Sequence, residues 1–138
     1  MTDTLNQAER SSRMARIKSK NTKPELIVRR LLHNLRYRYR LHVKEIPGKP
    51  DIVFKSRKKV IFVHGCFWHR HLSPDCKLVR FPKSRKDFWQ AKFSANVKRD
   101  AANLEQLAQE NWRVMVVWEC ELRNIEQVEN RLVGFLED

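Results

Sequence analysis

Residues 50–64 read Pro50-Asp-Ile-Val-Phe-Lys-Ser-Arg-Lys-Lys-Val-Ile-Phe-Val-His64 and contain two short apolar runs, Asp51–Phe54 and Val60–Val63, separated by a charged loop. Two apolar runs joined in this way predict a β-hairpin. A third strand is expected at Tyr37–Val43, where polar and apolar residues alternate, with a turn at Pro47–Pro50. The first three strands should therefore follow one another along the chain and form a sheet.

Helical patterns flank this stretch. Thr22-Lys-Pro-Glu25 predicts a helix start with Thr22 as N-cap, followed by a buried stripe of Ile27, Leu31, Leu32 and Leu35. Further along, a long helix is expected from Ser84 to about Asn111. Its candidate inward positions are Phe88, Ala91, Ala95, Leu104, Leu107 and Ala108.

The remaining elements complete the predicted fold. The run Val114–Trp118 is apolar throughout, which predicts an interior strand buried on both faces. Ile125, Val128, Leu132 and Phe135 have the spacing of an amphipathic helix. The order of elements predicts an α/β domain with a mixed sheet and helices on its faces.

The chain has 138 residues and a net charge of +13, which is concentrated in residues 1–99. That part holds 26 Lys and Arg against 7 Asp and Glu, whereas residues 100–138 hold 3 against 9. Such a basic region favours nucleic acid, because phosphate contacts release counterions; an anionic membrane surface is the less favoured alternative. We expect residues 1–20 to form a basic arm and residues 21–138 to form a single domain.

The composition also indicates the compartment. Three cysteines, an odd number, fit a reducing environment better than a disulfide framework. The first residues lack the layout of a signal peptide, and no apolar run approaches membrane-spanning length. We expect a cytoplasmic protein without a membrane partner.

Asp51 and two histidines are the strongest candidates for catalysis. Asp51 opens one strand of the hairpin, His64 ends the other, and His69 follows five residues later, so the three should meet at one end of the sheet. A carboxylate that holds Mg²⁺ and two imidazoles that handle protons and charge would suffice for phosphodiester hydrolysis. Alternatively, Asp51 is a turn residue and the histidines are zinc ligands or surface groups.

Glu25 has two interpretations. It is the only carboxylate between Ser11 and Arg40, a stretch that contains ten Lys and Arg. A capping box with Thr22 explains a glutamate at this position without any catalytic role. Both roles are compatible only if the helix cap and the site coincide.

Three cysteines and a histidine form a candidate zinc site. Cys66, His71 and Cys76 lie at intervals of five residues, and Cys120 follows the predicted strand Val114–Trp118. Three thiolates and one imidazole make a closed tetrahedral set, which is typical of structural zinc. Isolated buried thiols are the alternative.

Three aromatic residues lie among cations. Phe67 and Trp68 belong to the loop that contains the candidate zinc ligands, and Trp89 lies near Lys86 and Lys92. Apolar side chains on a stiffened loop can wedge between base pairs. Packing in the protein core is the alternative interpretation.

Several motifs together resemble the very-short-patch-repair (Vsr) DNA mismatch endonucleases, from about Ser12 to Leu136. They are Thr-x-x-Glu25, Pro-Gly-Lys-Pro-Asp51, Phe-Val-His-Gly-Cys-Phe-Trp-His69, Phe-Trp89, Asn-Val-Lys-Arg-Asp100 and Trp-Arg-Val-Met-Val-Val-Trp-Glu-Cys120. The resemblance implies a restriction-endonuclease-like fold and a Mg²⁺-dependent nick on the 5′ side of the thymine in a T:G mismatch. Such mismatches arise when 5-methylcytosine deaminates, and the nick begins very short patch repair.

The resemblance also implies residue roles. Asp51 would bind Mg²⁺ together with the main-chain carbonyl of Val63, and His69 would be the general base, assisted by His64 and Glu25. The zinc ligands would be Cys66, His71, Cys76 and Cys120, and the residues that intercalate beside the mismatch would be Phe67, Trp68 and Trp89.

Two positions depart from the family pattern. The interval from His71 to Cys76 is longer than in the family, and Val63 replaces a threonine whose backbone oxygen is the part used. The second acidic ligand and the lysine usual in this fold are also missing after Val60, which fits a chemistry based on histidine.

Three functions therefore compete. The leading hypothesis is a mismatch-directed DNA endonuclease that acts as a monomer, since a T:G pair has no two-fold symmetry. The others are a restriction-type endonuclease of the same fold and a zinc-stabilised DNA-binding module without catalysis. Proteins of the repair pathway are further candidate partners.

Overall fold

The computed structural model describes residues 21–69 and 85–138, apart from the side chains of Phe67 and Trp68. The predicted basic arm, residues 1–20, lies outside these ranges. The elements in chain order are α2 (Lys23–Asn34), β1 (Arg40–Leu41), β2 (Ile52–Phe54), β3 (Lys59–His64), α3 (Cys66–His69), α4 (Lys86–Gln109), β4 (Arg113–Trp118), the 3₁₀ helix η1 (Glu119–Arg123) and α5 (Ile125–Glu137). None of the described helices is long and apolar enough to cross a membrane.

A four-stranded mixed sheet has the order β1-β2-β3-β4. The β1/β2 and β2/β3 pairs are antiparallel and the β3/β4 pair is parallel, which confirms the predicted hairpin and the mixed α/β fold. The predicted strand at residues 37–43 is reduced to the two residues of β1.

The prediction for residues 114–118 was wrong in one respect, because β4 is an edge strand of the described sheet rather than an interior one. Its Met115 and Val117 are buried and its Val114 and Val116 are half-buried. Side chains on both faces of β4 pack into apolar clusters, which explains why the strand is apolar throughout. Only one of its two edges is hydrogen-bonded to another strand of the described sheet.

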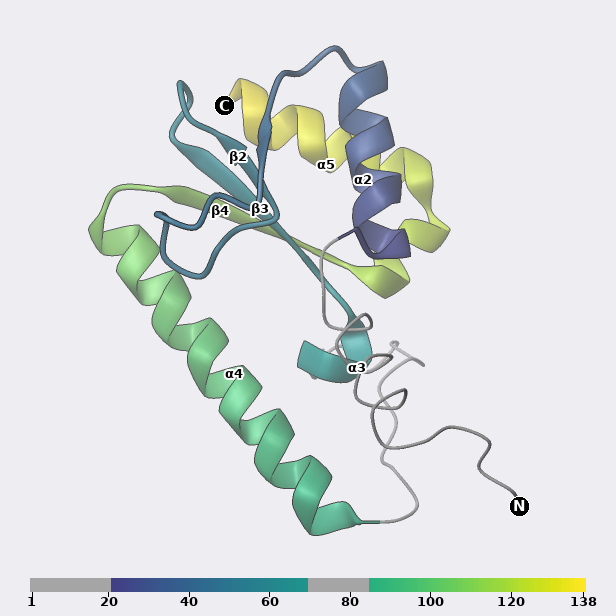
Figure 1. The fold of residues 1–138 in the computed structure, drawn as a ribbon. Helices are drawn as coiled ribbons and strands as arrows, with labels where there is room; N and C mark the ends of the chain where they lie inside the picture. Colours follow the sequence, from purple (N-terminus) through teal and green to yellow (C-terminus); the bar gives the residue numbers. More distant parts are fainter. Residues whose placement is uncertain (1–20, 70–84) are drawn as a thin grey trace.

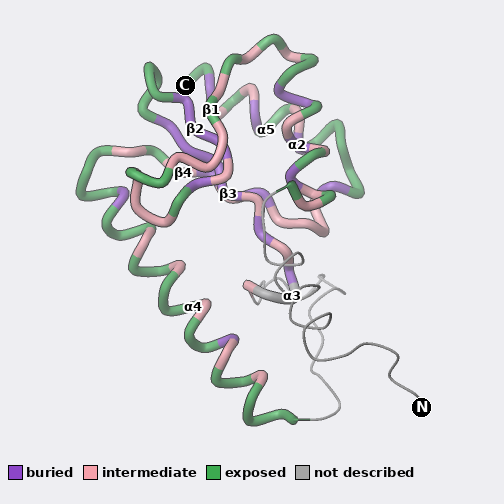
Figure 2. The backbone as a smooth tube through the Cα atoms, viewed as in Figure 1, coloured by how far each residue is buried: buried purple, intermediate pink, exposed green. Residues whose placement is uncertain are grey.

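Helices cover both faces of the sheet (Figure 1). Alternate residues of β3 point to opposite faces, so Ile61 joins the cluster with α2 and α5, whereas Val60 and Phe62 pack with Leu107 of α4. Figure 2 shows that the buried segments gather along the strands and on the inward sides of α2 and α5. The central strand β3 is therefore enclosed by two apolar clusters.

Local signals explain where α2 begins and ends. Thr22 Oγ1 accepts a hydrogen bond from the Glu25 N–H at 3.4 Å, and Pro24 lies in the first turn. Arg36 has a φ of +68° and follows the C-cap, which ends the helix. The buried stripe contains Val28 as well as Leu31 and Leu32, while the predicted Ile27 and Leu35 are only half-buried.

The predicted inward face of α4 was largely wrong. Of the predicted residues only Leu107 is buried, whereas Phe88 is 46% exposed and Leu104 is 38% exposed. Ala91, Ala95 and Ala108 are also exposed, and Phe93 is buried instead. Figure 1 shows the reason: only the C-terminal end of α4 lies against the sheet, and the rest extends past it.

The sheet brings several chain segments to one end. The parallel strands β3 and β4 finish together, since His64 is paired with Trp118. The antiparallel strand β2 begins close to this end, directly after Asp51, and α3 follows at once from β3. Residues far apart in the sequence can therefore meet here.

Candidate active site

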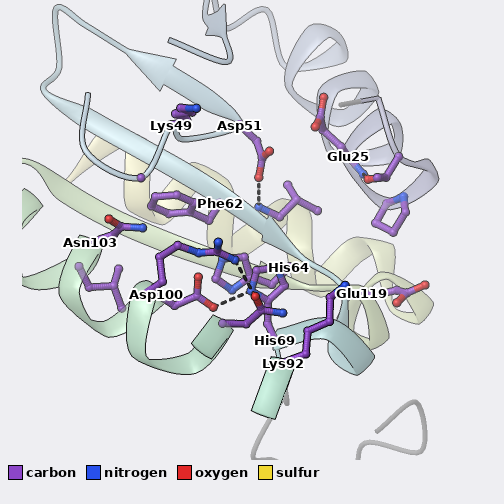
Figure 3. Close-up of a pocket in the computed structure, with 18 residues that line it drawn as sticks. Glu25, Lys49, Asp51, Phe62, His64, His69, Lys92, Asp100, Asn103 and Glu119 are labelled. Atoms are coloured by element: carbon purple, nitrogen blue, oxygen red, sulfur yellow. Dashed lines mark hydrogen bonds and ion pairs between the residues drawn. The ribbon is translucent and has the colours of Figure 1, made fainter. Parts of the chain in front are cut away.

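A cleft of about 890 Å³ lies at this end of the sheet, and residues from α2, the turn before β2, β3, α3, α4 and η1 line it. It contains five of the residues predicted to take part in catalysis or metal binding, namely Glu25, Asp51, Val63, His64 and His69. Figure 3 shows Asp51 and Glu25 toward one side of β3 and His64, His69 and Asp100 toward the other.

Asp51 is largely removed from solvent. Its Oδ2 accepts a hydrogen bond from the Val63 N–H at 2.7 Å, which ties the start of β2 to the end of β3. Burial, together with the negative charge of Glu25, raises the pKa of Asp51 to about 6, although the Val63 N–H and His42 act in the opposite direction. The ionised carboxylate is thus short of compensating positive charge.

Glu25 is both part of a helix cap and part of the cleft. Its N–H donates a hydrogen bond to Thr22, as the capping motif predicts. Its carboxylate contacts other residues, and Glu25 as a whole is only 2% exposed. The Nε2 atom of His42 lies 3.0 Å from each Glu25 carboxylate oxygen. The Nη1 atom of Arg29 donates to Oε2 at 3.3 Å. The cap and the site coincide because the backbone serves one and the side chain serves the other.

His64 and His69 form a stacked pair. Their ring centroids are 3.8 Å apart and their planes differ by 5°. Trp118 contacts both rings edge-on, at 5.1 Å from His64 and 6.5 Å from His69. The Nδ1 atom of His69 lies 2.6 Å from Oδ2 of Asp100, which is on α4. This hydrogen bond orients the His69 ring.

His64 is held neutral. Burial, together with the neighbouring His69, lowers its pKa to about 4, although Asp100 acts in the opposite direction. Its Nδ1 atom is buried and has no hydrogen-bond partner within the described part of the chain. At neutral pH this imidazole can therefore exchange hydrogen bonds with a ligand but carries no positive charge.

Two groups of metal-binding side chains lie at the cleft, and all of their members except His42 line it. One comprises Glu25, His42 and Asp51, and the other comprises His64, His69 and Asp100; in each group the ligand atoms lie within 4.8 Å of one another. The first group offers two carboxylates in a poorly solvated position, and hard oxygen ligands of this kind suit Mg²⁺. The residues present therefore fit the divalent ion that the family resemblance implies.

The predicted zinc ligands are only partly covered by the structure. The Cys120 N–H lies 3.4 Å from Sγ of Cys66, so the end of β4 and the start of α3 are in contact, as a shared zinc site requires. His71 and Cys76 lie outside the described residues, and the four-ligand set stays a prediction.

The predicted intercalating residues are likewise only partly described. The side chains of Phe67 and Trp68 lie outside the described part. Trp89 is half-exposed on α4 and stacks on Phe93, with ring centroids 5.8 Å apart. Its role in DNA binding stays a prediction.

The sequence interpretation assigned no role to His42 or to Asp100. His42 lies opposite Asp51 just beyond the β1/β2 ladder, so the strand register could have revealed it. Asp100 reaches His69 from a helix 31 residues further along the chain. No spacing rule connects those two positions, because the contact depends on how α4 crosses the sheet.

Comparisons with known proteins identify the family to which the chain is similar. A family model described as "DNA mismatch endonuclease Vsr" matches residues 2–77. The type II nicking enzyme V.XorIIP of Xanthomonas oryzae pv. oryzae is 51% identical over 137 residues, which cover 99% of this chain and 98% of that protein. The DNA mismatch endonuclease Vsr of Escherichia coli is 38% identical over 128 residues, which cover 93% of this chain and 80% of that protein.

A solved structure resembles the fold. The catalytic domain of the homing endonuclease I-Bth0305I aligns with a TM-score of 0.58 and 22% identity, covering 83% of this chain and 94% of that domain. At this level of identity the likeness concerns the fold alone.

Proposed function

The chain belongs to the Vsr family of DNA mismatch endonucleases, and from this premise we propose that it nicks one DNA strand on the 5′ side of the thymine in a T:G mismatch. Such mismatches result from deamination of 5-methylcytosine, and the nick would begin very short patch repair. The observation that carries the proposal is the single cleft in which Asp51, His69 and its partner Asp100 line the walls.

The proposed metal ligands are Asp51 and the main-chain carbonyl of Val63. A bound Mg²⁺ would supply positive charge at the scissile phosphate and lower the pKa of a water molecule. Asp51 would orient the ion, and its hydrogen bond to the Val63 N–H fixes the rotamer with which it does so. Glu25 would contribute a second negative charge close to the ion and its water shell.

His69 is the proposed general base. With Asp100 ionised, the proton that the two groups share lies on Nδ1 of His69, which leaves Nε2 as the proton acceptor. The neutral His64 ring stacked against it would hydrogen-bond to the phosphate or to water and keep bulk water from one face of His69. The pair thus combines one basic and one neutral imidazole.

The remaining predicted residues complete the proposal. Cys66, His71, Cys76 and Cys120 would hold a structural zinc ion that fixes α3 against the end of β4. Cations at the cleft, among them Lys49, Lys92 and Arg99, would contact the DNA backbone. Phe67, Trp68 and Trp89 would intercalate beside the mismatch. These roles fit a restriction-endonuclease-like enzyme.

The proposal extends to the setting of the reaction. A monomer is expected because a T:G pair is asymmetric. We expect the enzyme to act in the cytoplasm, with double-stranded DNA as its partner and repair-pathway proteins as further partners. The basic arm of residues 1–20 would add contacts to DNA phosphates.

A nicking assay on two duplexes tests the function. The duplexes are identical except that one contains a T:G pair, and each strand carries its own label. We expect Mg²⁺-dependent cleavage of the thymine strand in the mismatched duplex alone, lost in Asp51→Ala and His69→Ala and kept in His33→Ala, which alters an exposed histidine of α2. Equal cleavage of both duplexes would indicate a restriction-type enzyme, and an intact mismatched duplex would indicate a binding module.

A further inference from the structure

His42 occupies an unusual backbone position next to Asp51. The β1/β2 ladder pairs Arg40 with Val53 and Leu41 with Ile52, and His42 lies just beyond it. The His42 N–H donates to the Asp51 main-chain oxygen at 3.2 Å, and the His42 backbone has a φ of +51°. This left-handed conformation costs a residue other than glycine about 1–2 kcal/mol. Surrounding contacts must therefore hold it in place.

The conformation turns the imidazole onto Glu25. The Nε2 atom of His42 lies 3.0 Å from both carboxylate oxygens. The side chains are 14% exposed for His42 and 3% exposed for Glu25, so the contact is closed to most solvent. Arg29, which is also bound to Asn21, contacts Oε2 of Glu25 and leaves Oε1 without a contact to this guanidinium.

The spacing of these atoms matches a coordination sphere. Two neighbouring ligands of an octahedral ion with bonds of about 2.1 Å lie about 3 Å apart, and two opposite ligands lie about 4.2 Å apart. Nε2 of His42 and Oε1 of Glu25 are 3.0 Å apart, and the ligand atoms of Glu25, His42 and Asp51 all lie within 4.8 Å of one another. An ion that replaces the hydrogen bond would need only small movements of these side chains.

We propose that His42 is a direct nitrogen ligand of the divalent ion held by Asp51 and Glu25, and that it makes this site bind Mn²⁺ more tightly than Mg²⁺, although either ion can occupy it. The inference rests on the proposed function in one respect, because it assumes that this ion is the one at the proposed catalytic centre. Mg²⁺ prefers oxygen ligands alone, whereas Mn²⁺ tolerates an imidazole and binds a mixed nitrogen and oxygen site more readily. His42 thus sets the metal preference of the enzyme.

The test is spectroscopic and uses the whole protein without DNA. Mn²⁺ is added at one equivalent, and pulsed electron paramagnetic resonance measures the hyperfine coupling to a directly bound histidine nitrogen. We expect this coupling in the parent protein and in His69→Gln, which alters the second metal-binding group of the cleft. We expect its loss in His42→Gln, where the amide still reaches Glu25 but supplies no imidazole.

Affinity measurements complete the test. In His42→Gln the dissociation constant for Mn²⁺ should rise about tenfold or more, the scale seen when a group at a metal site is lost. The dissociation constant for Mg²⁺, measured by competition, should change by less than about threefold. The ratio of the two dissociation constants should therefore shift away from Mn²⁺. His42→Asn serves as a second variant, because asparagine adopts the left-handed conformation readily. Circular dichroism and the unchanged behaviour of His33→Gln control for folding.

Two results would overturn the inference. Nitrogen coupling that persists in both His42 variants, or is absent from the parent protein, would make His42 only a hydrogen-bond partner of Glu25. Equal losses of Mn²⁺ and Mg²⁺ affinity would show that His42 acts through Glu25 without selecting the metal. The proposed function is judged separately by nicking of the T:G duplex, so either hypothesis can fail while the other stands.

Discussion

Replacing Asp51 with asparagine should stabilise the protein in magnesium-free buffer while it abolishes nicking. The carboxylate is buried beside Glu25, which raises its pKa from 3.8 to about 6. A shift of one pKa unit corresponds to about 1.4 kcal/mol, so the ionised Asp51 costs the folded state about 3 kcal/mol at neutral pH. Asparagine has nearly the same shape, can still accept the Val63 N–H, and carries no charge.

The gain should depend on pH in a defined direction. An acid with a raised pKa binds its proton more tightly in the folded state, so the folded protein is favoured at low pH and loses stability as the pH rises through 6. The Asp51→Asn protein has no ionisable group at this position, so its stability does not fall in this way. The difference in the free energy of unfolding should be close to zero below about pH 4 and about 3 kcal/mol above about pH 7.

Urea unfolding at a series of pH values measures the difference. The buffer should lack both magnesium and chelators, so that any structural zinc stays bound. Adding Mg²⁺ should stabilise the parent more than the variant, because the ion binds only the folded site and needs the carboxylate. Asp87→Asn, at an exposed position of α4, is the matched control and should change stability by less than about 1 kcal/mol. A variant no more stable than the parent at neutral pH would refute the reasoning.

Three further outcomes are expected. Asp100→Asn should lower the single-turnover nicking rate by at least about a hundredfold, because His69 loses the partner that orients it. A rate within about threefold of the parent would show that Asp100 is not part of the site. Leu32→Ala should lower the free energy of unfolding in urea by about 2–5 kcal/mol, since Leu32 is fully buried. Leu26→Ala, at a position that is 44% exposed, should lower it by less than about 0.5 kcal/mol, and similar losses in the two variants would contradict the described core. Cys120→Ala should lower both the zinc content measured by mass spectrometry and the stability, whereas a full zinc complement would exclude Cys120 as a ligand.

The hairpin and the candidate catalytic residues on it were predictable because they depend on local order. Two apolar runs around a charged loop specify β2 and β3, and an antiparallel hairpin brings the start of one strand to the end of the other. Asp51 and His64 flank those runs, so the pairing alone brings both to the same cleft, although they belong to separate groups of ligand atoms. Their placement needed no knowledge of the helices.

Contacts that depend on helix packing were not predictable in the same way. The apolar spacing of α4 suggested a continuous inward face, but only its last turns meet the sheet, which buries Leu107 and leaves Phe88 exposed. The same crossing brings Asp100 to His69, and spacing carries no information about it. Glu25 was ambiguous for a different reason, because a capping motif and a site residue can share one position.

The central position of β3 has a consequence for heating. The first half of β3 is hydrogen-bonded to β2 and to β4, its second half up to His64 is paired with β4 within the described sheet, and apolar clusters enclose the strand on both faces. Segments of this kind exchange their amide protons only when the whole domain opens. Thermal inactivation, followed by nicking activity and by circular dichroism, should therefore coincide with global melting of the sheet that carries His64.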